Sequence, residues 1–236
     1  MNFIDTFKKK KWMLRSLPQT IYFNFKMLPF KQACKLPIWL YKPRFDSLSG
    51  CVKIDCPKNQ LKPGMIHIGN LRNNLFPNNG CMLDIKGELT FKGTCRFGNN
   101  TNISVGKRGK LVIEDGVSCG TSLKIACYHS ISFGKDVHVG WDCLFMDTDF
   151  HSLIRENGTR TRGYAPIVIG EGAWLGTGCK IFKRTQRPAH CIVSGMTILS
   201  GPVDCPERSL IGNPRSTEVK VTGIYRDYHD DKIVYP

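Results

Sequence analysis

The residues best suited to proton-transfer chemistry form one short run, Asp147-Thr148-Asp149-Phe150-His151. An imidazole titrates near neutral pH and can take a proton from a hydroxyl group, as a general base does. Two carboxylates precede the ring within four residues, and either Asp147 or Asp149 could orient it or raise its basicity. We therefore predict that His151 is a catalytic base, against the simpler alternative of a structural histidine.

This run opens a polar stretch, residues 147–166, that is rich in charged residues and glycine. The stretch interrupts an otherwise regular pattern of apolar residues. A long excursion from a repeating structure usually carries a function or is mobile. We therefore predict that residues 147–166 form the active-site loop.

On both sides of the stretch, aliphatic or aromatic residues recur every six positions. The phased series are Ile85, Phe91, Phe97 and Ile103; Leu111, Val117 and Leu123; Ile131, Val137 and Cys143; Ile169, Leu175 and Ile181; and Val193, Leu199, Cys205 and Ile211. This period fits neither an α-helix nor an amphipathic strand, but it is typical of a hexapeptide β-helix with three short strands per triangular coil. We predict an all-β solenoid in which these residues point inward, with longer turns or bulges where the phase shifts.

The first 45 residues follow a different pattern. They contain a run of four lysines at 8–11, then Trp12, and apolar residues at helical spacing. Ser16 and Gln19 form an S-x-x-Q capping box, with Pro18 in the first turn, which predicts a short helix carrying Ile21, Tyr22, Phe25 and Leu28.

The chain is therefore expected to have three parts. These are a basic helical N-terminal arm over residues 1–45, a β-helix domain over residues 46–222 and a C-terminal tail over residues 223–236. The arm should either cover the open end of the solenoid or contact anionic lipid. The sequence leaves that choice open.

Composition restricts the partners and the compartment. With 34 Lys and Arg against 19 Asp and Glu, the net charge of +15 favours a polyanionic partner such as an anionic membrane or a phosphate-rich co-substrate. No nucleic-acid recognition motif is present, so we expect no nucleic-acid partner. The 11 cysteines form no CxxC pair, and no HxxxH pair occurs, so we expect buried thiols and no metal site. No apolar run has the length of a membrane span, and we expect a cytoplasmic protein, at the inner membrane face if the arm binds lipid.

Three segments carry a more specific resemblance. They are the run DTDFH, the segment from Ile169 to Gly176 (IGEGAWLG), and the segment from Leu210 to Pro214 (LIGNP). Together they resemble the hexapeptide-repeat acyltransferases, most closely those of capsule and exopolysaccharide clusters of the colanic acid type, and the maltose and galactoside O-acetyltransferases. The resemblance covers nearly the whole chain and is most specific over residues 131–214.

The resemblance implies a left-handed parallel β-helix and a homotrimer with active sites between subunits. It also implies transfer of an acyl group, from acetyl-CoA as co-substrate, to a sugar hydroxyl in polysaccharide biosynthesis, with His151 as the base and no metal. The implied CoA-binding residues are Trp174, Thr177, Ser194, Gly195, Ser200, Gly201, Arg215 and Lys220, with Lys183 and Arg184 as further candidates for the CoA phosphates. Ser200 and Gly201 stand where that family often has a Thr-Lys pair, so this chain lacks that lysine.

Two other interpretations compete with this one. A γ-class carbonic anhydrase uses the same solenoid but needs three histidines around one metal, and the six histidines here include no pair four or five positions apart. A catalytically silent solenoid, serving as a structural or polyanion-binding module, predicts that replacing His151 changes only stability. The identity of the acyl acceptor and the acyl chain length stay open.

Overall fold

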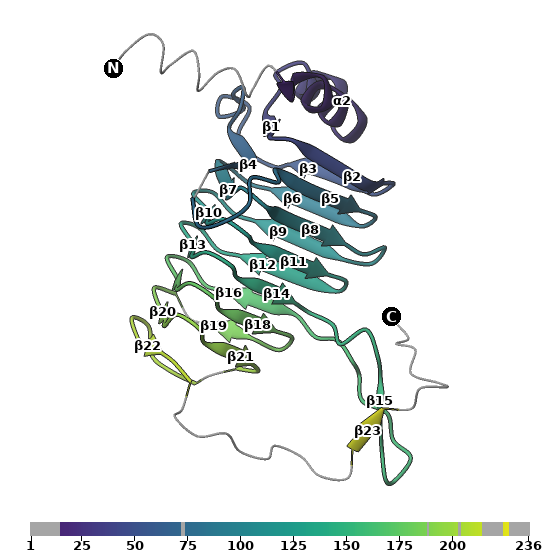
Figure 1. The fold of residues 1–236 in the computed structure, drawn as a ribbon, viewed down its shortest axis with the longest axis vertical. Helices are drawn as coiled ribbons and strands as arrows, with labels where there is room; N and C mark the ends of the chain where they lie inside the picture. The colour runs from purple at the N-terminus through teal and green to yellow at the C-terminus, as the bar shows by residue number, and fades with distance from the viewer. Residues whose placement is uncertain (1–14, 72–73, 188, 203, 214–223, 227–236) are drawn as a thin grey trace.

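The computed structural model describes residues 15–71, 74–187, 189–202, 204–213 and 224–226. The chain winds into stacked coils of three strands, and strands of successive coils pair in parallel to form three sheets (Figure 1). This confirms the predicted all-β solenoid, and the arrangement agrees with a left-handed parallel β-helix. A short helical segment lies at the N-terminal end of the stack.

The strands divide among three sheets, here called A, B and C. Sheet A contains β1 (Ile38–Leu40), β4 (Ile66–Leu71), β7 (Cys95–Gly98), β10 (Ser118–Cys119), β13 (His138–Val139), β17 (Trp174–Leu175), β20 (Ile192–Val193) and β22 (Leu210–Ile211). Sheet B contains β2 (Pro43–Leu48), β5 (Cys81–Ile85), β8 (Thr101–Val105), β11 (Lys124–Cys127), β14 (Leu144–Met146), β18 (Lys180–Phe182) and β21 (Ile198–Ser200). Sheet C contains β3 (Cys51–Ile54), β6 (Glu88–Phe91), β9 (Lys110–Ile113), β12 (Ser130–Phe133), β16 (Ile167–Ile169) and β19 (Gln186–Arg187).

The core follows the six-residue period. Every residue of the predicted inward series is buried except Cys205, which is half-buried. Many of the strands direct a second residue inward, two positions away from the first, as Phe133 is from Ile131. The sequence series missed this second inward position. Seven of the 11 cysteines are buried in the stack and all are free thiols, as expected of small apolar core residues.

The phase shifts of the repeat have a simple structural cause. Trp174 pairs with Ile192, 18 positions later, which is three hexapeptides per coil. Ser118 pairs with His138, 20 positions later, so that coil is two residues longer. The extra residues lie in the turn that joins sheet B to sheet C. The predicted longer turns are therefore confirmed, and they collect at one corner of the triangle.

The solenoid begins earlier than residue 46. Strands β1 and β2 already pair with β4 and β5, so the first coil starts inside the segment expected to be the arm. The helical part of that segment consists of α2 (Leu17–Met27) and α3 (Phe30–Ala33).

Helix α2 covers the free edge of sheet A by means of polar side chains. Asn24 Oδ1 accepts a hydrogen bond from the backbone N–H of Ile38, and its Nδ2 donates to the Ile38 carbonyl. Thr20 Oγ1 accepts from the N–H of Leu40. Four helical residues rise by about 6 Å and two strand residues by about 6.6 Å, so side chains spaced by four match backbone groups spaced by two.

Ser16 extends this series and corrects the predicted capping box. Its Oγ accepts a hydrogen bond from the N–H of Lys42 at 2.9 Å and makes no cap bond to the helix. The helix was therefore predicted correctly, but the capping box was not, because the serine hydroxyl serves the strand edge instead.

Candidate active site

The predicted loop leaves the solenoid at the corner between sheets B and C. Residues 147–166 connect β14 of sheet B to β16 of sheet C and project away from the coils (Figure 1). We call this segment the excursion. Its outer part contains β15 (Leu153–Arg155), which pairs antiparallel with β23 (Ile224–Arg226), a strand from the expected C-terminal tail.

The base of the excursion is a narrow neck in which its two ends run side by side. The backbone N–H of Asp149 donates to the Gly163 carbonyl at 2.7 Å, and the N–H of Ala165 donates to the Asp147 carbonyl at 3.1 Å. Thr148 and Tyr164 form an antiparallel bridge between these bonds. The neck therefore holds residues 147–149 in a defined position against the stacked coils.

Asp147 anchors the neck to the preceding coil. Its side chain is fully buried, and its two oxygens accept hydrogen bonds from the backbone N–H groups of Tyr128 and His129, each at 2.8 Å. Burial raises the pKa of this carboxyl, and the N–H donors act in the opposite direction. Asp147 is thus a positioning residue, because both oxygens of its carboxylate bind backbone N–H groups.

Asp149 has a different partner. Its Oδ2 forms an ion pair with Nζ of Lys183, which follows β18 on the next coil. The two predicted carboxylates therefore fasten the neck to the coils on either side of it. Lys183, a candidate for the CoA phosphates, is engaged in that pair.

His151 lies directly beyond the neck and is half-buried. The residue before it, Phe150, has φ of +60°, a left-handed conformation that non-glycine residues seldom adopt. Its ring packs edge-on against Tyr128, with ring centroids 4.8 Å apart, and its N–H donates to Thr148 Oγ1. The strained turn at Phe150 thereby sets the direction in which His151 leaves the neck.

Two residues that contact the neck, Tyr128 and His129, were not singled out from the sequence. Tyr128 and His129 contact Asp147 through their backbone, and the His129 ring packs on buried Tyr164 with centroids 4.8 Å apart. The guanidinium of Arg162 lies 4.6 Å from the centre of the Tyr164 ring. Burial lowers the pKa of His129; Asp147 acts to raise it, and Arg162 and Lys110 lower it further.

The register explains how these residues could have been found. Ala126 pairs with Met146, which places Cys127 beside Asp147. Tyr128 and His129 follow at once, in the longer turn between sheets B and C. Counting one coil of 20 residues back from the DTDFH run therefore leads to them.

The candidate CoA-binding residues occupy two corners rather than one. Thr177, Ser194 and Gly195 lie in the turns between sheets A and B, and Trp174 lies just before them on β17 with 55% of its surface exposed. Backbones of adjacent coils are close there, since a Cβ on Gly176 would lie 2.5 Å from the Gly195 nitrogen. These four residues form a compact group that we call the A–B corner group.

Ser200 and Gly201 lie instead at the corner between sheets B and C. Ser200 pairs with Phe182, and it is Phe182 that lies one coil beyond the excursion. A Cβ on Gly201 would meet no atom within 4 Å, so the backbone there borders open space. Arg184 is exposed at the same corner, whereas Arg215 and Lys220 lie outside the described residues.

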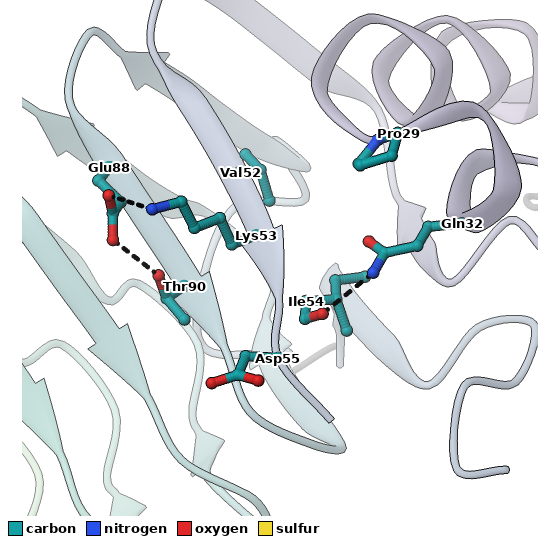
Figure 2. Close-up of a pocket in the computed structure, with 8 residues that line it drawn as sticks. All are labelled: Pro29, Gln32, Val52, Lys53, Ile54, Asp55, Glu88 and Thr90. Carbon is teal, nitrogen blue, oxygen red and sulfur yellow. Dashed lines mark hydrogen bonds and ion pairs between the residues drawn. The ribbon is translucent and has the colours of Figure 1, made fainter. Parts of the chain in front are cut away.

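A separate pocket of about 460 Å³ lies under α3, away from the excursion (Figure 2). Lys53 donates to Glu88 at 2.6 Å there, and Thr90 donates to the same carboxylate. Gln32 Nε2 donates to the Ile54 carbonyl. The lining residues are Pro29, Gln32, Val52, Lys53, Ile54, Asp55, Glu88 and Thr90. None of them belongs to the predicted site.

Two further observations concern the described residues alone. They contain no group of three or more His, Cys, Asp or Glu side chains placed to share a metal ion. No helix in this part of the chain has the length and apolarity needed to cross a membrane.

No family model matches the chain. An uncharacterized 24.8 kDa protein in the cps region of Klebsiella pneumoniae is 26% identical over 152 residues, which is 64% of this chain and 64% of that protein, so the match spans less than two thirds of its length. The polysialic acid O-acetyltransferase OatWY is similar in structure with a TM-score of 0.44 and 21% identity, over 75% of this chain and 94% of its own.

The polySia-specific acetyltransferase NeuO is similar with a TM-score of 0.40 and 15% identity, over 78% of this chain and 82% of its own. By their names, both solved structures are acetyltransferases, the activity that the sequence resemblance also implies.

Proposed function

We propose that this chain is an acetyl-CoA-dependent O-acyltransferase that modifies a saccharide hydroxyl, with His151 as general base. The observation that carries the proposal is the neck. Buried Asp147, the left-handed turn at Phe150 and the pair between Asp149 and Lys183 present one half-buried imidazole at the only long excursion among the described coils. A simple surface turn would not need three separate anchors.

The chemistry follows from a neutral imidazole. A ring nitrogen of His151 removes the proton of the acceptor hydroxyl while the hydroxyl oxygen attacks the thioester carbonyl carbon. The carbon–sulfur bond then breaks, the acyl group stays on the sugar oxygen, and the imidazolium returns its proton to the departing CoA thiolate. Exposed Arg184 and, outside the described residues, Arg215 and Lys220 are the proposed partners of the CoA phosphates.

The site is proposed to form between subunits of a homotrimer. His151 and the A–B corner group lie at opposite ends of the sheet B strands, and β18 alone spans three residues, or about 10 Å. A neighbouring copy would bring its A–B corner group to the excursion of the first. Trp174, Ile192 and Leu210 form an exposed apolar row in register on sheet A, which such a contact would cover.

The saccharide acceptor is proposed from the cps-region relative and the family resemblance. The basic side chains near the neck, Arg162 and Lys110, favour an acceptor that carries negative charge. Polysialic acid and neutral polysaccharides are suitable probes for that preference.

The first test is His151→Ala, assayed by release of free CoA thiol with a panel of acidic and neutral saccharides. We expect turnover to fall by about 10²- to 10⁴-fold, with unchanged thermal unfolding and acetyl-CoA binding. His190→Ala is the matched control, because His190 is exposed at the corner between sheets C and A. Equal turnover of the His151→Ala variant and the wild type would contradict the role of His151 as general base, whereas absence of turnover by the wild type would favour the silent-module alternative.

The second test is complementation between two inactive variants. His151→Ala lacks the base, and Trp174→Ala alters the A–B corner group. When both are co-expressed, mixed trimers contain some interfaces with both residues intact, so part of the activity should return. Co-expression that restores no activity would contradict a site shared between subunits.

A further inference from the structure

Helix α2 buries polar side chains and exposes apolar ones, unlike an ordinary surface helix. Its buried face carries Thr20 and Asn24, which serve the backbone of β1, beside Phe23 and Met27. Surface helices normally bury their apolar stripe and expose the polar one. Here the polar side chains satisfy the edge of sheet A, so most of the remaining apolar side chains are left on the outside.

The outward face is correspondingly apolar. Leu17, Ile21 and Phe25 follow one another at intervals of four on α2, and each exposes between 39% and 45% of its surface. The row continues on α3 with Phe30, which is 73% exposed and contacts Phe25 ring to ring. We call these four residues the α2–α3 apolar face. Figure 1 shows α2 at the N-terminal end of the stack, on top of the first coil.

The segment that carries this face contains basic residues and no acidic ones. Residues 6–45 contain ten lysines and arginines and no aspartate or glutamate, so this segment holds +10 of the net charge of +15. All of the described basic residues in it are exposed, among them Lys26 and Lys31 beside the apolar face. An apolar face bordered by cations on an acid-free segment is complementary to a surface with an apolar interior and anionic headgroups.

We infer that the α2–α3 apolar face docks the protein on the surface of an anionic phospholipid bilayer. The aromatic and aliphatic side chains would enter the headgroup boundary, and the surrounding lysines would contact the lipid phosphates. A protein partner or a second copy of the chain would not require a segment free of acidic residues. The inference does not depend on the proposed acyltransferase activity, because it concerns the opposite end of the molecule.

The test is flotation of the full-length protein with vesicles of phosphatidylcholine alone or phosphatidylcholine mixed with phosphatidylglycerol. We expect binding to the mixed vesicles only, weakened by about 0.5 M salt. The variant Ile21→Gln/Phe25→Gln/Phe30→Gln should bind at least about tenfold more weakly. Lys26→Gln/Lys31→Gln/Lys35→Gln should lose part of the preference for anionic lipid.

The matched control is Leu75→Gln/Met82→Gln/Val168→Gln, which removes three exposed apolar side chains from other surfaces and should leave binding unchanged. Thermal unfolding and acetyl-CoA binding of each variant confirm that it is folded. Two results would overturn the inference: absence of wild-type binding to mixed vesicles, or equal binding by the apolar-face variant. A change in oligomer mass of that variant, without loss of vesicle binding, would assign the face to a subunit contact instead.

Discussion

The regular coils and the excursion differ in the kind of contact that holds them in place. In the coils each inward side chain stacks on an apolar side chain at the equivalent position one coil away, as Phe133 does on Ile113 in sheet C. In the excursion each anchoring contact is unique: Asp147 to the backbone at 128–129, and Asp149 to Lys183. The stacked core contacts together stabilise the solenoid, whereas the unique contacts of the neck position the imidazole of His151. Substitutions in the two regions should therefore damage different properties.

The largest effect on stability is expected in the coils. Phe133 is fully buried and packs against Phe145 with ring centroids 4.8 Å apart. Phe133→Ala should lower the free energy of unfolding by about 3–5 kcal/mol, because it leaves a cavity. Urea unfolding measures this, and Ser132→Ala, on the outward side of the same strand, is the control. A loss below that of the control would contradict the assigned core position.

A smaller loss, with a larger effect on activity, is expected at the neck. Asp147→Ala leaves the partly buried backbone N–H groups of Tyr128 and His129 without their acceptor, so the free energy of unfolding should fall by about 2–3 kcal/mol. Turnover should fall as well, because the excursion loses its anchor. Asp46→Ala removes an exposed carboxylate paired with Lys86 and should change neither property. Full activity of Asp147→Ala would show that the neck does not position His151.

Acid should weaken the fold through two histidines. Burial lowers the pKa of His67 and of His129 from the ordinary value of 6.5. Below that value the unfolded chain binds more protons than the folded one, so stability falls as pH drops toward the lowered pKa values. The raised pKa of Asp147 acts with the opposite sign, above its ordinary value of 3.8.

We expect the urea concentration at the unfolding midpoint to decrease as the pH is lowered from about 7 to about 5.5. His67→Gln and His129→Gln should each flatten that dependence, and His190→Gln should not. An unchanged slope in the first two variants would remove these histidines from the explanation.

The smallest effect is expected for the ion pair between Asp149 and Lys183. Both side chains are partly exposed, so Lys183→Gln should change the unfolding free energy by less than about 1 kcal/mol. Faster amide exchange within residues 147–166 would reveal the loosened neck even so. A double-mutant cycle with Asp149→Asn measures the coupling. Coupling that persists at high salt would indicate a tighter pair than the exposure suggests.

The period of six was sufficient to predict the solenoid, one set of its inward residues and the point where the excursion leaves it. That information is local, since each hexapeptide repeats the same strand and turn. The type and position of His151 within the polar run were equally visible, although its catalytic role stays a prediction.

Only the tertiary structure decided what each carboxylate contacts, which corner each candidate CoA residue occupies, and which face of α2 points outward. These features depend on alignment between coils, and coil length varies from 18 to 36 positions between paired residues of sheet A from β10 onward. A two-residue change in one turn shifts every later partner along the stack. The sequence alone therefore determined the repeating unit, whereas the stacking of unequal coils determined which residues meet.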